Sequence, residues 1–161
     1  MATKDELISG LKMLIQEGRR LAADLSDIQW ERVVDLDGWK SKEVLAHVAG
    51  IGALVVPMVG GLANAPAGAD AMAAVDIDQM NAGIVASKAG RSAKELADEL
   101  ETAYGGVIDF VKNAPEETLA KRATARGHKD VPVSDLVMRM VVLHGLGHIY
   151  SVYSSVFFSK D

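Results

Sequence analysis

Two histidines stand four positions apart in an almost wholly apolar stretch near the end of the chain. His144 and His148 lie in "RMVVLHGLGHIYSVY", residues 139–153, where a packed core would favour leucine. On an α-helix, side chains at positions i and i+4 lie one above the other, with Cβ atoms about 5 to 6 Å apart. Both imidazoles can therefore converge on one point, an arrangement that can chelate a metal ion.

A third donor must come from another helix, because two nitrogens hold a divalent ion poorly and bundle-core metal sites draw ligands from facing helices. His47 is the candidate, since leucine, valine and alanine residues flank it on a second apolar segment. His128 lies in the charged stretch "ARGHKD". It is expected to be a solvated loop residue that takes no part in the site.

The three histidines can also be interpreted as ordinary hydrogen-bonded core residues, and an i, i+4 pair can arise by chance. Against this, each buried neutral imidazole has a ring N–H and a bare ring nitrogen to satisfy, and the core offers few polar partners. A shared cation would satisfy three ring nitrogens together. The spacing favours the metal site and leaves the core interpretation open.

Residues near His47 supply weaker candidates. Glu43 precedes it by four positions and could orient its ring or act as a base. The alternative for Glu43 is an acid in the first turn of a helix, where it faces the positive end of the macrodipole. Trp39 is expected to pack over the start of that helix as a hydrophobic anchor, with stacking on a substrate as the alternative.

Composition excludes several classes of function. The chain has 161 residues, 49% of them hydrophobic, which suits one well-buried domain spanning 1–161. A net charge of −5 and 5% aromatic residues argue against a nucleic-acid partner. There is no cysteine, so disulfides, thiolate catalysis by the protein and sulfur-ligated metals are excluded, which also suits a reducing cytoplasm. The charged N-terminus does not resemble an export signal.

The segment 44–69 carries no formal charge and could be read as a membrane span. It contains His47, Asn64, two prolines and several glycines, and its apolar part is shorter than the roughly 20 residues a span needs. A helix buried in protein or at a dimer interface is therefore favoured. A third interpretation makes this segment the contact surface for a different protein.

Apolar residues recur at helical spacing in four long segments and one shorter one. Thr3 with Glu6 and Ser92 with Glu95 have the form of capping boxes at two helix starts. Pro57 is expected to bend or end the second helix, because proline lacks the N–H that a helix interior needs. The expected helices are 4–25, a second from 40 onward, 75–89, 92–113 and 133–158, with a turn at 35–39, a loop at 60–68 and a polar connection at 121–132.

No alternating strand pattern bounded by hairpin turns is present, so the sequence predicts an all-α fold. Four long helices and a short one in a chain of this size predict a four-helix bundle. The long interval between the second helix and the helix containing Leu96 predicts a crossover connection. The glycines around the histidines are expected to allow close helix packing.

Three stretches resemble one known family. "GWKSKEVLAHVAG" is similar to the start of the second helix in the DinB-like superfamily, and "LHGLGHIYSVY" is similar to its last helix with an H-x-x-x-H pair. That superfamily includes the N-terminal domain of mycothiol-dependent maleylpyruvate isomerase and the bacillithiol transferases. The middle of the chain, from 75 to 119, is similar to the DfsB/ClbS-like branch. The resemblance covers the whole chain.

The resemblance implies a DinB-like bundle in which His47, His144 and His148 hold a divalent metal at one end, with zinc or nickel favoured. The remaining coordination positions would be open to water or substrate, including the thiol of a low-molecular-weight cofactor. Asn81 matches an asparagine that could point its amide into the pocket; otherwise it is a helix-surface residue. No cluster of arginine or lysine that would grip a cofactor's carboxylates is visible near the histidines.

The leading hypothesis is therefore a cytoplasmic, homodimeric, metal-dependent enzyme for thiol transfer or hydrolysis on a small electrophilic molecule, without nucleic-acid or membrane partners. The alternative is a non-enzymatic stress-related protein that binds or sequesters a small ligand in an apolar pocket and holds no metal.

Overall fold

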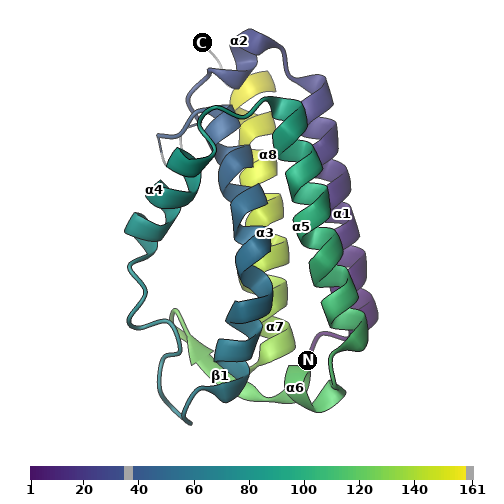
Figure 1. Cartoon of the computed structure of the whole chain (residues 1–161), viewed down its shortest axis with the longest axis vertical. Helices are drawn as coiled ribbons and strands as arrows, with labels where there is room; N and C mark the ends of the chain where they lie inside the picture. The colour runs from purple at the N-terminus through teal and green to yellow at the C-terminus, as the bar shows by residue number, and fades with distance from the viewer. Residues whose placement is uncertain (35–37, 159–161) are drawn as a thin grey trace.

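The computed structural model describes residues 1–34 and 38–158, and most of them are helical (Figure 1). The predicted turn at 35–39 lies mostly outside the described residues. The elements in chain order are α1 (Lys4–Asp24), α2 (Asp27–Trp30), α3 (Ser41–Asn64), α4 (Ile77–Ser87), α5 (Ala93–Asn113), α6 (Glu116–Ala120), β1 (Arg122–Ala125), β2 (His128–Pro132), α7 (Val133–Val137), the π-helical η1 (Met138–Leu143) and α8 (His144–Phe157).

Four long helices form the bundle that the sequence predicts. α1 packs against α5 and α8, and α3 packs against the same two helices, so α1 and α3 lie on opposite corners. In Figure 1, α1 and α8 run upward while α3 and α5 run downward. Because the neighbours α3 and α5 are parallel, the chain must cross the length of the bundle between them. The connection that contains α4 does this and confirms the predicted crossover.

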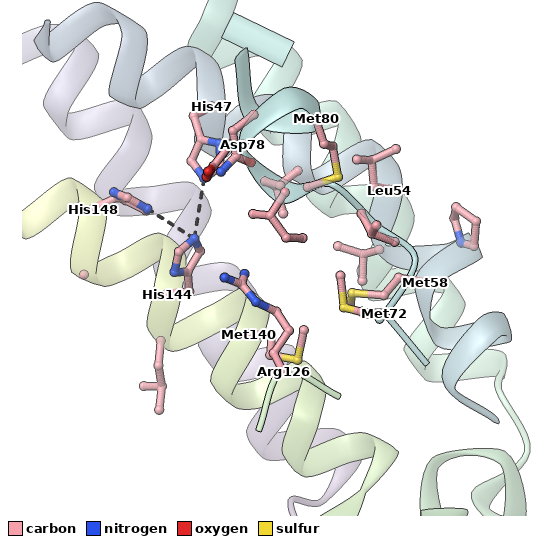
Figure 2. A pocket seen from close by; sticks show the side chains of 18 of the residues that line it. His47, Leu54, Met58, Met72, Asp78, Met80, Arg126, Met140, His144 and His148 are labelled. Carbon is pink, nitrogen blue, oxygen red and sulfur yellow. Dashed lines mark hydrogen bonds between the residues drawn. The ribbon is translucent and has the colours of Figure 1, made fainter. Parts of the chain in front are cut away.

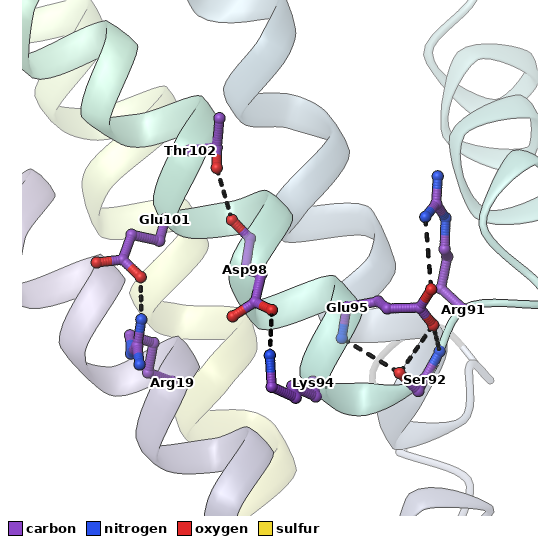
Figure 3. A network of polar contacts seen from close by, with 8 residues as sticks. All are labelled: Arg19, Arg91, Ser92, Lys94, Glu95, Asp98, Glu101 and Thr102. Carbon is purple, nitrogen blue, oxygen red and sulfur yellow. Dashed lines mark hydrogen bonds and ion pairs between the residues drawn. The ribbon is translucent and has the colours of Figure 1, made fainter.

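Both predicted capping boxes are present. At α1, the backbone N–H of Thr3 donates to the carboxylate of Glu6 at 2.8 Å, and the Glu6 N–H donates to Thr3 Oγ1 at 3.2 Å. Ser92 and Glu95 make the same pair at the start of α5 (Figure 3). These bonds satisfy N–H groups that a helix start leaves without partners, and so fix where both helices begin.

Of the two effects expected of Pro57, a bend or an end, the structure excludes the end, because α3 continues to Asn64. Pro57 and Ala53 both lie on the exposed side of α3, so the carbonyl that loses its donor faces outward. Val55, Val59 and Leu62 are buried on the inner side and hold the last turns against the core. Burial on one face therefore outweighs the missing hydrogen bond, and the predicted loop at 60–68 is helical in its first half.

α3 is long and apolar enough to cross a membrane by length and composition. Within its most apolar window, 56% of the helix is buried inside the protein. α3 packs against α4, α5 and α8, which are parts of the same chain. These are the features of the central helix of a bundle.

The polar connection at 121–132 is a β-hairpin, which the all-helical prediction missed. β1 and β2 pair antiparallel, with Ala125 opposite His128 and a two-residue turn at Arg126 and Gly127. Both turn residues have positive φ, +50° and +83°, as a tight hairpin turn of this length requires. The inward positions Ala123 and Ala125 are buried alanines, whose small side chains produce no strand-like apolar alternation.

The last helix runs from Val133 to Phe157 as predicted, but it is not uniformly α-helical. Its middle portion, η1, is π-helical, and the backbone N–H of His144 bonds to the carbonyl of Arg139, five residues back. A π-helical turn inserts an extra residue and changes the angle at which the following side chains leave the helix. η1 therefore sets the direction of the histidines that begin α8.

Candidate metal and ligand site

The three histidines predicted to be ligands converge at one point in the upper half of the bundle. Nε2 of His144 lies 3.5 Å from Nε2 of His47 and 3.1 Å from Nε2 of His148. One ring nitrogen from each lies within 4.8 Å of the others. The three rings are nearly perpendicular in pairs, with interplanar angles of 82°, 73° and 86°. Figure 2 shows the imidazoles directed at a common spot.

Two elements distant in sequence supply these rings. His47 lies in the second turn of α3, on its buried face, and its side chain is 2% exposed. His148 is 7% exposed on the inner face of α8, whereas His144, one turn earlier, is exposed. Because α3 packs against α8, two inner rings form the back of the site and His144 forms its outer edge.

The surroundings of His47 hold its ring in the neutral form. Burial, followed by the neighbouring rings of His148 and His144, lowers its pKa from 6.5 to about 4. Its Nδ1 is buried and has no hydrogen-bond partner among the described residues. A neutral imidazole can offer a nitrogen lone pair to a cation, so this environment suits a ligand.

Trp39 lies directly against the histidines. Its ring centroid is 5.0 Å from that of His47 and 6.3 Å from that of His148, with the latter pair stacked. The Trp39 carbonyl accepts a 2.7 Å hydrogen bond from the N–H of Val34, which fixes the backbone ahead of α3. The anchoring role predicted for Trp39 therefore extends to holding two imidazole rings in place.

The histidines border a cavity of about 940 Å³. Its walls come from α3, α4, the segment between them, the hairpin turn, η1 and α8. Apolar side chains form most of the lining, including Met58, Met72, Met80 and Met140 (Figure 2). A cavity of this size with an apolar wall and a few polar groups is typical of small-molecule sites.

The weaker candidates fall in different places. Glu43 caps α3, where its carboxylate accepts a 2.7 Å hydrogen bond from the N–H of Lys40, and it does not line the cavity. Asn81 does line the cavity, and its Oδ1 is buried without a partner among the described residues. His128 is half-buried at the start of β2, outside the cavity lining.

Two charged residues of the cavity were missed by sequence reasoning. Asp78 lies in the first turn of α4, and Arg126 lies at the turn of the hairpin. Arg126 is 18 positions before His144 and belongs to a segment read as a solvated connection, so spacing gave no reason to place it at the site. Gly127 was the available signal, because glycine suits the second position of a two-residue hairpin turn.

Comparison with known proteins agrees with this fold. The family model of the mycothiol maleylpyruvate isomerase N-terminal domain matches residues 11–146. The crystal structure of the mycothiol-dependent maleylpyruvate isomerase superposes with a TM-score of 0.70 at 14% sequence identity, covering 94% of this chain and 63% of that one.

A crystal structure of a histidine-to-alanine variant of that isomerase gives a TM-score of 0.64 at 14% identity, covering 91% of this chain and 62% of the other. The chain thus spans less than two thirds of these proteins, and at this identity they show a shared fold. No curated protein matches the chain. The family model covers most of the chain, and on that ground the chain belongs to the family of the mycothiol maleylpyruvate isomerase N-terminal domain, within the DinB-like superfamily.

Proposed function

We propose that this chain is a metal-dependent enzyme in which a low-molecular-weight thiol, or water, attacks a small electrophilic molecule held in the apolar cavity. The observation that carries the proposal is the convergence of His47, His144 and His148 at the edge of that cavity. Membership of a family described by a mycothiol-dependent isomerase supports the thiol as co-substrate.

The histidine cluster fits a divalent cation. Zinc–imidazole bonds are about 2.0 to 2.1 Å long, so two nitrogens at the corners of a tetrahedral site lie about 3.3 Å apart. The observed Nε2 separations of 3.1 and 3.5 Å bracket that value. Imidazole is a ligand for zinc, nickel, cobalt and iron(II), with zinc or nickel favoured here as in the sequence analysis.

His47, His144 and His148 would hold the ion and leave at least one position open toward the cavity. A divalent ion in such a site acts as a Lewis acid and lowers the pKa of a bound water or thiol. The chain itself contains no cysteine, so a thiol nucleophile must come from a cofactor.

The other lining residues have separate roles in this proposal. The methionine-rich wall binds the apolar body of the substrate and excludes water from it. Trp39 keeps two imidazoles in orientation. Asn81 offers a buried carboxamide oxygen that can accept a hydrogen bond from a substrate N–H or O–H group.

Metal content tests the first half of the proposal. Protein purified without chelator should contain about one divalent ion per chain by elemental analysis, as three converging donors predict. A variant with His47, His144 and His148 all replaced by alanine should contain none. His128→Ala is the matched control, because this histidine lies outside the cluster, and it should keep the ion.

A conjugation screen tests the second half. The metal-loaded protein is incubated with an electrophilic model substrate and, in turn, mycothiol, bacillithiol or glutathione, and thiol adducts are measured by mass spectrometry. Adduct formation that is lost in the triple alanine variant supports thiol transfer. Turnover without any thiol supports hydrolysis.

The large apolar cavity also favours a second candidate function, in which the protein binds a small molecule without chemistry. That function predicts no stoichiometric metal in the wild type and ligand binding that does not depend on added metal. Metal content therefore separates the two candidates before any substrate is known.

A further inference from the structure

Arg126 has an unusual position for an arginine. It is the first residue of the two-residue turn between β1 and β2, with φ at +50°. Asparagine, aspartate and glycine are the residues favoured there. Glycine has no Cβ to clash at positive φ, and asparagine and aspartate have short polar side chains that hydrogen-bond to the nearby backbone. An unfavourable backbone conformation kept at the edge of a cavity points to a role for the side chain that it carries.

The backbone beneath Arg126 is tied to the cavity wall. Its N–H donates to Oδ2 of Asp70 at 3.1 Å, and Oδ1 of the same carboxylate accepts from the N–H of Met72 at 2.9 Å. The N–H of Ala71 donates to the carbonyl of Thr124 at 2.9 Å. These bonds join the hairpin turn to the segment between α3 and α4, which carries Ala71 and Met72 of the cavity lining.

The side chain of Arg126 points into the cavity. In Figure 2 its guanidinium is directed toward His144, from the opposite side of the cavity to the apolar residues of α3. Among the described residues that line the cavity, Arg126 is the only one with a permanent positive charge, and Asp78 is the only one with a carboxylate.

The guanidinium of Arg126 has no acidic partner within 4.0 Å among the described residues, and Asp78 does not pair with it. Four other arginines of the chain pair with acids on the protein surface. These pairs are Arg19 with Glu101, Arg20 with Asp24, Arg91 with Glu95 and Arg122 with Asp130. Arg126, an exposed residue of the lining, therefore keeps its bidentate donor group available to a ligand in this largely apolar cavity.

We infer that Arg126 is a specificity-determining residue that binds an anionic group, a carboxylate in the first instance, on the substrate of this site. The inference relies on the proposed function for the chemistry near the histidines. It adds the chemical class of the substrate. The substrate then has an apolar body against the methionines, an electrophilic centre near the histidines and a carboxylate at the hairpin turn.

The test compares two ligands of the same shape that differ in charge. 4-Phenylbutyrate is ionised at neutral pH, and 4-phenylbutanamide is its neutral counterpart. Each is titrated into the full-length protein by calorimetry, first as purified and then after metal removal, which eliminates binding of the carboxylate to an ion. Two variants accompany the wild type. Arg126→Asn removes the guanidinium but suits positive φ, and Arg139→Asn removes an exposed arginine that does not line the cavity.

The wild type and the Arg139→Asn variant should bind the carboxylate about tenfold or more tightly than the amide, as expected for a charge-assisted hydrogen bond in an apolar site. Arg126→Asn should abolish this preference in the metal-free protein, where no ion can bind the carboxylate. No carboxylate preference in the metal-free wild type, or an equal preference in metal-free Arg126→Asn, overturns the inference. The result is independent of whether the purified protein contains metal or conjugates a thiol, so this inference and the proposed function can fail separately.

Discussion

The buried imidazole of His47 should make the stability of the metal-free protein depend on pH. Its pKa is 6.5 in an ordinary setting and about 4 in the folded chain, so between these values the unfolded chain binds more protons. The contribution of neutral His47 to the free energy of unfolding is therefore complete above about pH 6.5, and it is lost as the pH falls toward 4. The free energy of unfolding of metal-free protein should decrease across this window in urea titrations.

His47→Gln removes this titration while keeping a polar side chain. The variant should show a shallower decrease in the free energy of unfolding than the wild type between about pH 6.5 and pH 4. The difference between the two proteins isolates His47 from the other three histidines, which both proteins retain. Parallel curves for the two proteins would contradict the assignment of the low pKa to His47.

A substitution at Glu43 distinguishes a helix-capping role of this residue from a catalytic one. Its carboxylate accepts the N–H of Lys40 at the start of α3, one turn before His47. Glu43→Ala should lower the free energy of unfolding by about 1 kcal/mol, because it removes a helix-start hydrogen bond and a favourable charge at the helix dipole. Urea denaturation measures this change, and elemental analysis should show an unchanged metal content. Loss of the ion in this variant would instead connect Glu43 to the metal site.

At the scale of the elements, the separation of α3 and α5 depends on Gly52. A Cβ at Gly52 would lie 2.9 Å from the Cβ of Ala103 and 3.1 Å from the ring of Tyr104. The same ring donates its hydroxyl to the carbonyl of Val48 at 3.0 Å. Ala103 has no flexible side chain that can move aside, so the two helices must separate to admit even one methyl group.

Gly52→Ala should therefore destabilise the protein by about 1 to 3 kcal/mol, the usual range for overpacking a core. Gly106→Ala in α5 is the matched control, because a Cβ there meets nothing within 4 Å. It should stabilise the helix by up to about 1 kcal/mol, the difference in helix propensity between glycine and alanine. Urea denaturation of both variants gives the comparison, and equal effects would show that packing at Gly52 is not limiting.

The elements that sequence reasoning predicted correctly are those with strong local signals. Thr3 with Glu6 and Ser92 with Glu95 mark helix starts by short-range chemistry, and the helices after them have regular apolar spacing. The persistence of α3 beyond Pro57 could not be predicted, because it depends on burial against other helices. The β-hairpin was missed because its inward residues are alanines, and the π-helical turn leaves no mark in a uniformly apolar stretch.

The same distinction holds for the site. The histidine pair His144 and His148 is a local feature at helical spacing, and His47 stood out by its apolar neighbours, so the cluster could be proposed from the sequence. Arg126 reaches the cavity only through a hairpin and its bonds to Asp70, which are long-range consequences of the fold. The tertiary structure was needed to find it.

At the scale of the whole molecule, one part of the bundle is tightly packed and another part makes few apolar contacts. α1, α3, α5 and α8 share a continuous buried core, whereas α4 has no buried residue and packs mainly on α3. Ile84 of α4 approaches α3 so closely at Gly50 that a Cβ there would clash with it. The cavity therefore has one wall in the rigid core, which carries the histidines, and another in an element held by few apolar contacts. Dimerisation and cytoplasmic location stay predictions.

Metal binding should stabilise the whole fold, because the three donors belong to α3 and α8, which are far apart in sequence and meet only in the folded chain. An ion at about 100 times its dissociation constant adds about 2.7 kcal/mol, which for a domain of this size raises the melting temperature by roughly 5 to 10 °C. Without cysteine, the unfolded chain has few groups that could compete for the ion. Thermal unfolding of chelator-treated protein, followed by circular dichroism with increasing zinc, measures the shift. His128→Ala should respond as the wild type does, and the triple alanine variant of the cluster should not respond. An equal shift in the triple variant would place the bound zinc elsewhere and leave the three imidazoles as packing residues.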